Sequence, residues 1–303
     1  MRLMVCEHGD GTAVYALRGG EAVNLSALDP ALGPDLRPLI ALGGRLPARV
    51  AALVDGDAGT PAADLTPALP VARPDQVICL GLNYVDHVKE GGYDIPDYPA
   101  LFMRGLPSLL PAGAPMVRPS CSEQLDYEAE LMVVIDTGGR HIAAERALAH
   151  VFGYTLFNDG SVRDYQRKTH QWTPGKNFDD TGAVGPLVVT PDELPPCAAG
   201  LRIQSRVNGE VLQDADTDDM MVPVAQAIET ISRYTTLAPG DLIAMGTPPG
   251  VGHARTPPKW LRPGDRVEVE IEGIGICANP VVAEEDFVML GAENDIIALA
   301  DAT

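Results

Sequence analysis

Long apolar runs, aromatic residues and basic charge are all scarce in this sequence of 303 residues. No apolar stretch approaches the roughly 20 residues of a membrane-spanning helix, so no helical span is expected. Aromatic residues make up only 5% of the chain, yet apolar residues reach 46%, which is typical of a globular protein and not of a disordered one. A chain of this length can bury one large core and form a smaller second domain.

Basic residues number 22 against 42 acidic ones, which gives a net charge of -20. Nucleic acids and anionic membrane surfaces bind basic patches, so neither is an expected partner. An acidic chain is compatible with cation binding but does not by itself indicate it.

Cysteines are few and widely spaced: Cys6, Cys79, Cys121, Cys197 and Cys277. They form no Cys-x-x-Cys pair, so the sequence indicates neither a zinc knuckle nor a disulfide framework. Residues 1–7 become acidic too early for a signal peptide. We therefore predict a cytoplasmic protein.

Residues 1–72 are predicted to form a small N-terminal domain, and residues 73–303 a larger one. Three short apolar segments with glycine-containing turns between them predict hairpins, and a helix is expected at 47–55. These apolar segments are 2–6, 12–17 and 21–25. The proline-rich stretch 66–74 should be extended, which makes it a natural linker.

The strand predicted at 125–135 carries two acids, Glu128 and Glu130, on one face. Side chains alternate along a strand, so these carboxylates project the same way about 7 Å apart. The opposite face is apolar and consists of Tyr127, Ala129, Leu131 and Val133. Like charges this close repel unless a cation lies between them, and a hard divalent cation prefers such oxygen ligands. A solvated strand face with alternating acids is the alternative.

A histidine and an acid follow the apolar run 77–82. If a helical turn begins near Asn83, His87 and Glu90 are three residues apart and share one face. A carboxylate beside an imidazole makes an oriented general base. An ordinary surface pair on a short helix would have the same spacing.

Asp159 lies in the turn that ends a strand predicted at 151–157. The helix that follows would place Arg163 and Gln166 on one face. Asp159 or Ser161 could cap this helix. Polar loop residues after a strand are also common in binding sites.

Two loops add polar groups. Lys176, in the turn-rich loop 172–179, is solvated by default, but beside a bound cation its charge would stabilise a developing enolate. The glycine-rich loop 246–252 offers the hydroxyl of Thr247. It lacks the Lys-Ser/Thr pair of a phosphate-binding loop, so nucleotide binding is not expected.

The rest of the larger domain has ordinary structural patterns. Asn208-Gly209 predicts a hairpin. Residues 222–236 predict an amphipathic helix whose apolar positions include Ile231 and Tyr234. The alternating acids in 266–272 are predicted to be the wet face of an antiparallel strand.

Seven segments together resemble the fumarylacetoacetate hydrolase family, in the family's order and across about residues 77–282. They are GLNYVDHVKE (81–90), LDYEAELMVVI (125–135), GYTLFNDGSVRDYQ (153–166), WTPGKNF (172–178), RVNGEVLQDADTDDM (206–220), GTPPGVG (246–252) and LRPGDRVEVEIEGIG (261–275). Each motif alone is weak, but seven in order leave little room for coincidence.

The resemblance implies an α+β fold, mostly β: a mixed β-sandwich roll with a small N-terminal α/β domain, in a homodimer. It implies a divalent metal, Mg²⁺ or Mn²⁺, held by Glu128, Glu130 and Asp159. It further implies that the catalytic residues are His87, Glu90 and Lys176. The implied substrate-binding residues are Arg163, Gln166 and Thr247. Many family members have a lysine where this chain has Arg104, so recognition of the far end of the substrate is expected to differ.

The leading hypothesis is hydrolysis of a C–C bond in an acylpyruvate-like 2,4-dioxo acid, in the breakdown of aromatic compounds or sugar acids. The metal would chelate the 2-oxo carboxylate, and His87, held by Glu90, would take a proton from the attacking water. Lys176 and Gln166 would stabilise developing negative charge. A lyase or isomerase on 2-oxo acids (oxaloacetate decarboxylase, hydratase or tautomerase) needs the same groups, and a non-catalytic metal- or sugar-acid-binding protein is a further alternative.

Overall fold

The computed structural model describes residues 1–55, 59–92 and 94–291. The strands of this part of the chain are β1 Arg2–His8, β2 Gly11–Arg18, β3 Glu21–Asn24, β4 Thr60–Pro61, β5 Val77–Gly81, β6 Ala100–Met103, β7 Leu109–Pro111, β8 Met116–Arg118, β9 Leu125–Asp126, β10 Ala129–Ile135, β11 Val151–Asp159, β12 Ser161–Val162, β13 Gly182–Val184, β14 Leu187–Val189, β15 Arg202–Val207, β16 Glu210–Asp216, β17 Leu242–Ala244, β18 Arg266–Ile271 and β19 Gly275–Ala283. The α-helices are α1 Leu25–Leu28, α2 Arg37–Ile40, α3 Leu46–Val54, α4 Val85–Glu90, α5 Ala144–Ala147, α6 Arg163–Gln166, α7 Thr173–Lys176, α8 Val224–Tyr234 and α9 Glu284–Gly291.

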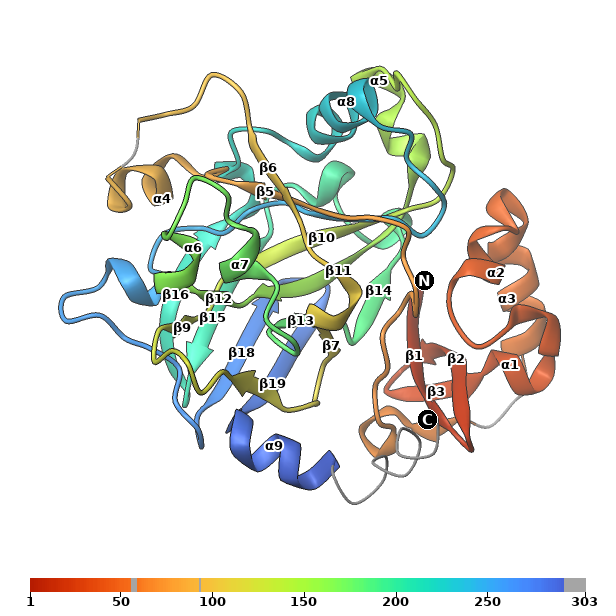
Figure 1. Cartoon of the computed structure of the whole chain (residues 1–303). Coiled ribbons are helices and arrows are strands. Elements are labelled where there is room, and N and C mark those ends of the chain that lie inside the picture. The colour runs from red at the N-terminus through yellow and green to blue at the C-terminus, as the bar shows by residue number, and fades with distance from the viewer. Residues whose placement is uncertain (56–58, 93, 292–303) are drawn as a thin grey trace, which may run out of the picture.

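Two mixed sheets make up most of the described chain (Figure 1). The larger one follows the order β4-β3-β2-β1-β14-β11-β10-β17-β5-β6, with β13 beside β11 and β7 beside β13. The smaller one follows the order β16-β15-β18-β19-β8, and β9 pairs separately with β12. Strands β10 and β11 contact β15, β18 and β19 of the smaller sheet, so the two sheets form a sandwich.

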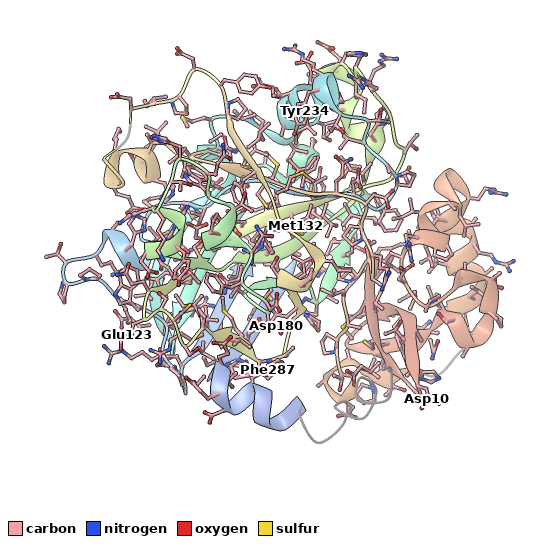
Figure 2. The ribbon with its side chains drawn as sticks, viewed as in Figure 1. Asp10, Glu123, Met132, Asp180, Tyr234 and Phe287 are labelled. Carbon is pink, nitrogen blue, oxygen red and sulfur yellow. The ribbon has the colours of Figure 1, made fainter. Side chains whose placement is uncertain are left out.

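Strands β10 and β11 form the centre of this sandwich, and every residue in both is buried. Side-chain alternation sends Leu131 and Val133 of β10 into the core between the two sheets. It sends Met132 and Val134 into a second core, to which helices α1, α2 and α3 contribute leucines. Met132 is accordingly buried, and its label lies near the centre of the view in Figure 2. The centre of the fold is therefore packed on both faces.

The first 72 residues extend the larger sheet. Strand β1 pairs antiparallel with β14, with Arg2 opposite Val189. The three predicted apolar segments correspond to β1, β2 and β3, and the helix expected at 47–55 is α3. This part lies at the right of Figure 1, coloured red to orange. The division of the chain at residue 72 stays a prediction.

Other local predictions have mixed outcomes. The hairpin at Asn208-Gly209 joins β15 to β16, and both turn residues have positive φ, as this turn requires. Helix α8 buries Ile231 as expected, but Tyr234 is 51% exposed at the end of the helix, so its assignment to the apolar face is wrong. The acids of β18 are half-buried between fully buried apolar residues. No described helix is both long and apolar enough to cross a membrane.

Candidate metal centre and active site

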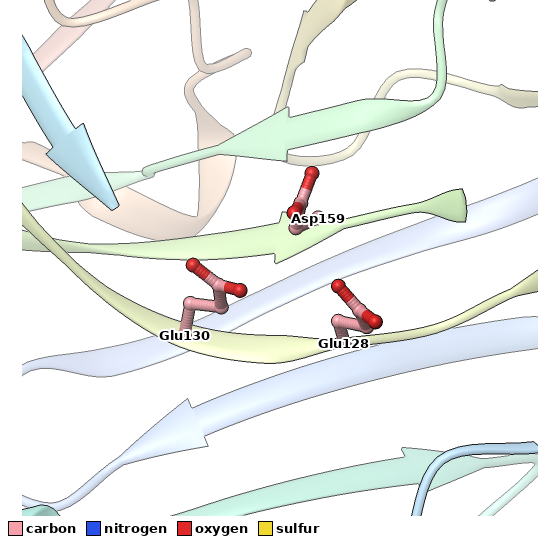
Figure 3. A group of neighbouring side chains, drawn as sticks. All are labelled: Glu128, Glu130 and Asp159. Carbon is pink, nitrogen blue, oxygen red and sulfur yellow. The ribbon is translucent and has the colours of Figure 1, made fainter. Parts of the chain in front are cut away.

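Three acids meet where β10 and β11 pair. Glu128 directly precedes β10, Glu130 lies within it, and Asp159 ends β11. The amide of Asp159 donates to the carbonyl oxygen of Glu128 over 2.9 Å, which sets the register at this point. One carboxylate oxygen from each acid lies within 4.8 Å of the others, and Figure 3 shows the side chains gathered together. The prediction that Glu128 and Glu130 share one face is confirmed.

This acid triad is buried. Glu128 is 4% exposed, Glu130 1% and Asp159 0%. The side-chain oxygen of Asn158 accepts a 3.0 Å hydrogen bond from the amide of Glu128 and fixes the backbone there. A solvated strand face is therefore the wrong interpretation of the alternating acids.

Three buried cations surround the triad. Lys176 Nζ lies 2.5 Å from Oε2 of Glu128 and 2.6 Å from Oδ2 of Asp159. Arg163 approaches Oε1 of Glu128 to 2.6 Å, and Arg104 forms an ion pair with Asp159. A solvated Lys176, the default alternative, is therefore the wrong interpretation. No side chain caps α6, so the capping role suggested for the turn before it is also wrong.

Positive charge is distributed unevenly over the triad. Burial alone would raise the pKa of Glu128, but Arg163 and Lys176 outweigh burial and hold this pKa well below its ordinary value. Burial, with the negative charges of Asp159 and Glu128, raises the pKa of Glu130 far above its ordinary value. Among the described residues, Glu130 is thus the acid of the triad without an ion pair.

The donor set of the triad fits a hard divalent cation. Three carboxylates converge, and carboxylate oxygens are ligands that Mg²⁺ and Mn²⁺ prefer. A dication beside Glu130 would offset the charge of this carboxylate, which makes no ion pair among the residues that the structure describes. The amide of Gly246 donates to Oε2 of Glu130 over 3.0 Å and orients this carboxylate. The residues present therefore suit the metal that the resemblance implies.

Helix α4 brings an oriented histidine to the same place. Nδ1 of His87 lies 2.8 Å from Oε1 of Glu90, and Oε2 of Glu90 accepts a 2.9 Å hydrogen bond from the amide of Gly250. The predicted i, i+3 pair is confirmed. His87 is only 7% exposed, so an ordinary surface pair is the wrong interpretation. With Nδ1 engaged, Nε2 is the ring nitrogen available to a ligand.

One cavity joins these groups. Its lining includes all the predicted site residues except Glu90: His87, Glu128, Glu130, Asp159, Arg163, Gln166, Lys176 and Thr247. Arg163 donates to Gln166 over 2.9 Å, which confirms that they share a face of α6. The cavity volume is about 30 Å³, room for about two water molecules, so side chains must move before a substrate can enter.

Arg104 differs from its expected role. Its guanidinium is buried, donates to the hydroxyl of Thr181 over 2.7 Å and to that of Ser108 over 3.1 Å, and pairs with Asp159. It does not line the cavity. The expectation that this position affects recognition of the far end of the substrate is therefore wrong, because Arg104 lies behind the triad and supports Asp159.

Two further residues at the site were missed by the sequence analysis. Asp126 is 0% exposed and accepts a 2.8 Å hydrogen bond from Nε of Arg163. It also accepts from the amide of His253 over 3.0 Å, and the ring of His253 lines the cavity. Asp126 precedes Glu128 by two residues, so strand alternation could have placed it on the same face. No sequence signal pointed to His253.

Comparisons with known proteins extend these observations. The family described as fumarylacetoacetate (FAA) hydrolase C-terminal matches residues 76–282. The chain is 41% identical over 267 residues to the human mitochondrial oxaloacetate tautomerase FAHD2A. The aligned residues cover 87% of this chain and 85% of that protein. The relatedness therefore spans most of both proteins.

Solved structures are similar over nearly the whole chain. A fumarylacetoacetate hydrolase from Exiguobacterium antarcticum has a TM-score of 0.77 and 33% identity, covering 94% of this chain and all of that one. Maleylpyruvate hydrolase from Sphingobium sp. SYK-6, in complex with manganese(II) and pyruvate, has a TM-score of 0.77 and 30% identity. The match covers 93% of this chain and 99% of that one. The predicted fold class is confirmed. The chain belongs to the fumarylacetoacetate hydrolase family, a family of divalent-metal-dependent enzymes.

Proposed function

We propose that this protein is a divalent-metal-dependent enzyme that interconverts the keto and enol forms of a short 2-oxo acid of the oxaloacetate type. The observation that carries the proposal is one cavity lined by both the acid triad and His87, which Glu90 orients. A non-catalytic binding protein would instead be expected to keep His87 far from the carboxylates. An imidazole that lines the same cavity as the acid triad can transfer protons to and from a substrate bound there, which favours an enzyme over a binding protein.

Glu128, Glu130 and Asp159 are the proposed metal ligands. When bound, a dication would act as a Lewis acid toward the oxygens of a 2-oxo carboxylate and make the neighbouring C–H group more acidic. Arg104, which pairs with Asp159, and Asn158, which holds the backbone of Glu128, would keep the ligands in place.

His87 is the proposed base. Keto-to-enol conversion removes a proton from the carbon next to the ketone and places a proton on the ketone oxygen. Because Glu90 holds Nδ1, Nε2 of His87 is free to take the carbon-bound proton, and the imidazolium can then deliver this proton to the ketone oxygen, which completes the enol. The amide of Gly250 fixes Glu90, so the ring is oriented before substrate binds.

Lys176 has a second proposed role besides neutralising the acids. Its ammonium now contacts Glu128 and Asp159, so it must release at least one of these oxygens when a cation binds. Lys176 would then donate to the substrate oxygen that gains negative charge. Gln166 and Thr247, which line the same cavity, would contact the substrate together with Arg163.

Hydrolysis of an acylpyruvate, the leading hypothesis from the sequence, becomes the second candidate. The 41% identity to a protein named as an oxaloacetate tautomerase exceeds the 30% identity to the maleylpyruvate hydrolase. In the hydrolytic route His87 would take its proton from water instead of carbon.

The proposal is tested by loading the purified protein with Mg²⁺ or Mn²⁺ and following the decay of enol-oxaloacetate absorbance, with acylpyruvate cleavage measured in parallel. We expect rapid tautomerisation that a chelator abolishes and that His87→Ala lowers by about 10²–10⁴-fold. A His150→Ala variant serves as the control, since His150 lies outside the cavity lining. Equal turnover with and without metal, or in His87→Ala, would overturn the proposal. Fast acylpyruvate cleavage without tautomerisation would favour the second candidate.

A further inference from the structure

We propose that Trp172 is a gate over the cavity, and that binding of a dication at the acid triad opens this gate through Lys176 and Phe102. Substrate entry would then follow metal binding, because Lys176 in its present position keeps the cavity closed. The inference rests on the proposed function, since the acid triad must bind the cation that triggers the opening.

The cavity beside the triad is too small for a substrate. Its volume is about 30 Å³. Pockets that enclose small organic ligands measure about 300 Å³ or more, so part of the lining must move before a 2-oxo acid can bind. Trp172 has the largest side chain of this lining, and it is half-buried. Its displacement would therefore open more space than that of any other lining residue.

Apolar contacts hold Trp172 in place. Its ring lies directly on the backbone of Gly81, where an added Cβ would come within 2.2 Å of Cζ3 of the ring. The ring also meets that of Phe102 edge-on, with the two centroids 5.6 Å apart. Among the residues that the structure describes, the indole nitrogen of Trp172 has no hydrogen-bond partner. No directional bond therefore has to break when this side chain moves.

Phe102 connects Trp172 to the acid triad. Its ring centroid lies 4.9 Å from Nζ of Lys176, in a cation–π contact. The same ammonium contacts Glu128 and Asp159, two of the proposed metal ligands. A dication that binds these acids takes their oxygens and repels the ammonium, so Lys176 must shift. Because Phe102 contacts both side chains, it can transmit this shift to Trp172.

The backbone of α7 provides a second connection. The carbonyl oxygen of Trp172 accepts hydrogen bonds from the amides of Gly175 over 3.0 Å and Lys176 over 3.2 Å. Trp172 and Lys176 thus lie at the two ends of a single helical turn. Asn177 fixes the turn on its other side, because its Oδ1 accepts a 2.6 Å hydrogen bond from the amide of Gly105. A movement of Lys176 is therefore transmitted toward Trp172.

The fluorescence of Trp172 tests the proposal without an activity assay. The chain has two tryptophans, and Trp260 does not line the cavity, so Trp260→Phe leaves Trp172 as the single reporter. Mg²⁺ is the probe, because Mn²⁺ itself quenches fluorescence. At constant ionic strength, we expect saturating Mg²⁺ to raise acrylamide quenching of Trp172 by about twofold or more, as the ring leaves its packed position. Trp172→Phe, which leaves Trp260 as the reporter, is the control and should show no change.

Two variants, made in the Trp260→Phe protein, distinguish a gate from a merely structural aromatic contact. Phe102→Leu keeps an apolar side chain but removes the ring, so Mg²⁺ should still bind while the quenching of Trp172 no longer responds to it. Gly81→Ala pushes the indole off its position, so quenching should be high even without Mg²⁺. Because coupling is reciprocal, Gly81→Ala should also tighten Mg²⁺ binding, measured by calorimetry, by about fivefold or more. Gly11→Ala, where nothing lies within 4 Å of the added Cβ, should change neither quantity.

The outcomes separate the inference from the proposed function. If calorimetry shows that no Mg²⁺ binds, or that Glu130→Gln leaves binding unchanged, the proposed metal site fails and the inference fails with it. If Mg²⁺ binds at the triad but the quenching of Trp172 does not change, the inference is overturned and the proposed function stands. Unchanged Mg²⁺ affinity in Gly81→Ala also overturns the inference. Circular dichroism establishes that each variant folds, and if Gly81→Ala does not, the response of Trp172 to Mg²⁺ decides alone.

Discussion

At the scale of single residues, Glu130 differs from the other two acids of the triad in its contacts with cations. Cations contact Glu128 and Asp159 directly, whereas no ion pair to Glu130 occurs in the ranges that the structure describes. Burial and its acidic neighbours raise its pKa. Glu130 is therefore the residue whose charge depends most on a bound dication.

We predict that Glu130→Gln weakens Mn²⁺ binding by at least about tenfold, because a charged oxygen ligand is lost. Without metal, the same change should leave the melting temperature unchanged or raise it, since a buried like-charge repulsion is removed. Calorimetric titration and thermal unfolding measure the two effects. The control is Glu272→Gln, because Glu272 is an exposed acid in the turn between β18 and β19. Unchanged Mn²⁺ affinity in Glu130→Gln would contradict the ligand assignment.

Arg104 gives a prediction about stability. Arg104→Met removes a buried partner of Asp159 and should lower the free energy of unfolding by about 3–5 kcal/mol. Adding Asp159→Asn should restore part of the loss, because the unpaired charge disappears. Urea unfolding measures both. Arg233→Met removes only a half-exposed pair with Glu229 and should cost less than about 1 kcal/mol. A similar small cost for Arg104→Met would contradict this role.

The cysteines give a chemical test of burial. Burial raises the pKa of Cys277 to about 12 and, with the charge of Glu7, that of Cys6 to about 12, while Cys121 is exposed. The thiolate is the reactive form, so at pH 8 a thiol reagent should modify Cys121 first. Cys6 and Cys277 should react only after unfolding in urea. Cys197 is half-buried, so a fast phase that survives the double substitution Cys121→Ser, Cys197→Ser would show that the burial is wrong.

At the scale of elements, the contact between α6 and α7 positions Lys176. A Cβ atom at Gly175 would lie 2.4 Å from both the amide nitrogen and Cβ of Gln166, so the two helices can approach only because this residue is glycine. The triad is thus built from a strand pair on one side and a close helix contact on the other.

We therefore predict that Gly175→Ala pushes α7 away from α6 and moves Lys176 off the triad. Activity should fall at least about tenfold, since a displacement of about 1 Å can cost 10²-fold. Gly11→Ala, where nothing lies within 4 Å of the added Cβ, should keep full activity. Activity assays with far-ultraviolet circular dichroism as a folding check decide the outcome. Wild-type activity in Gly175→Ala would contradict the argument.

The elements also show what the sequence could predict. Period-two alternation was enough to place Glu128 and Glu130 on one face, and i, i+3 spacing was enough to pair His87 with Glu90. Side chains that act through contacts distant in sequence were not predictable in this way. The partner of Arg104 lies 55 residues away, and no local pattern specifies that separation.

At the scale of the whole molecule, the acid triad lies on the face of the larger sheet that carries Met132, Val134 and Phe157, opposite the core between the two sheets. Both faces of β10 are packed, so the ligands cannot relax to separate their charges. The fold therefore holds the three carboxylates together, in the arrangement that binding of a dication would need. The homodimer and the cytoplasmic location stay predictions.

The central claim is that Glu128, Glu130 and Asp159 bind one divalent cation. Anomalous X-ray scattering from crystals grown with Mn²⁺ tests it most directly. We predict a single strong manganese peak, with one oxygen from each of the three acids at about 2.1–2.3 Å and Lys176 displaced from at least one of them. A peak elsewhere, or Lys176 still bridging Glu128 and Asp159 with no metal present at saturating Mn²⁺, would contradict the account.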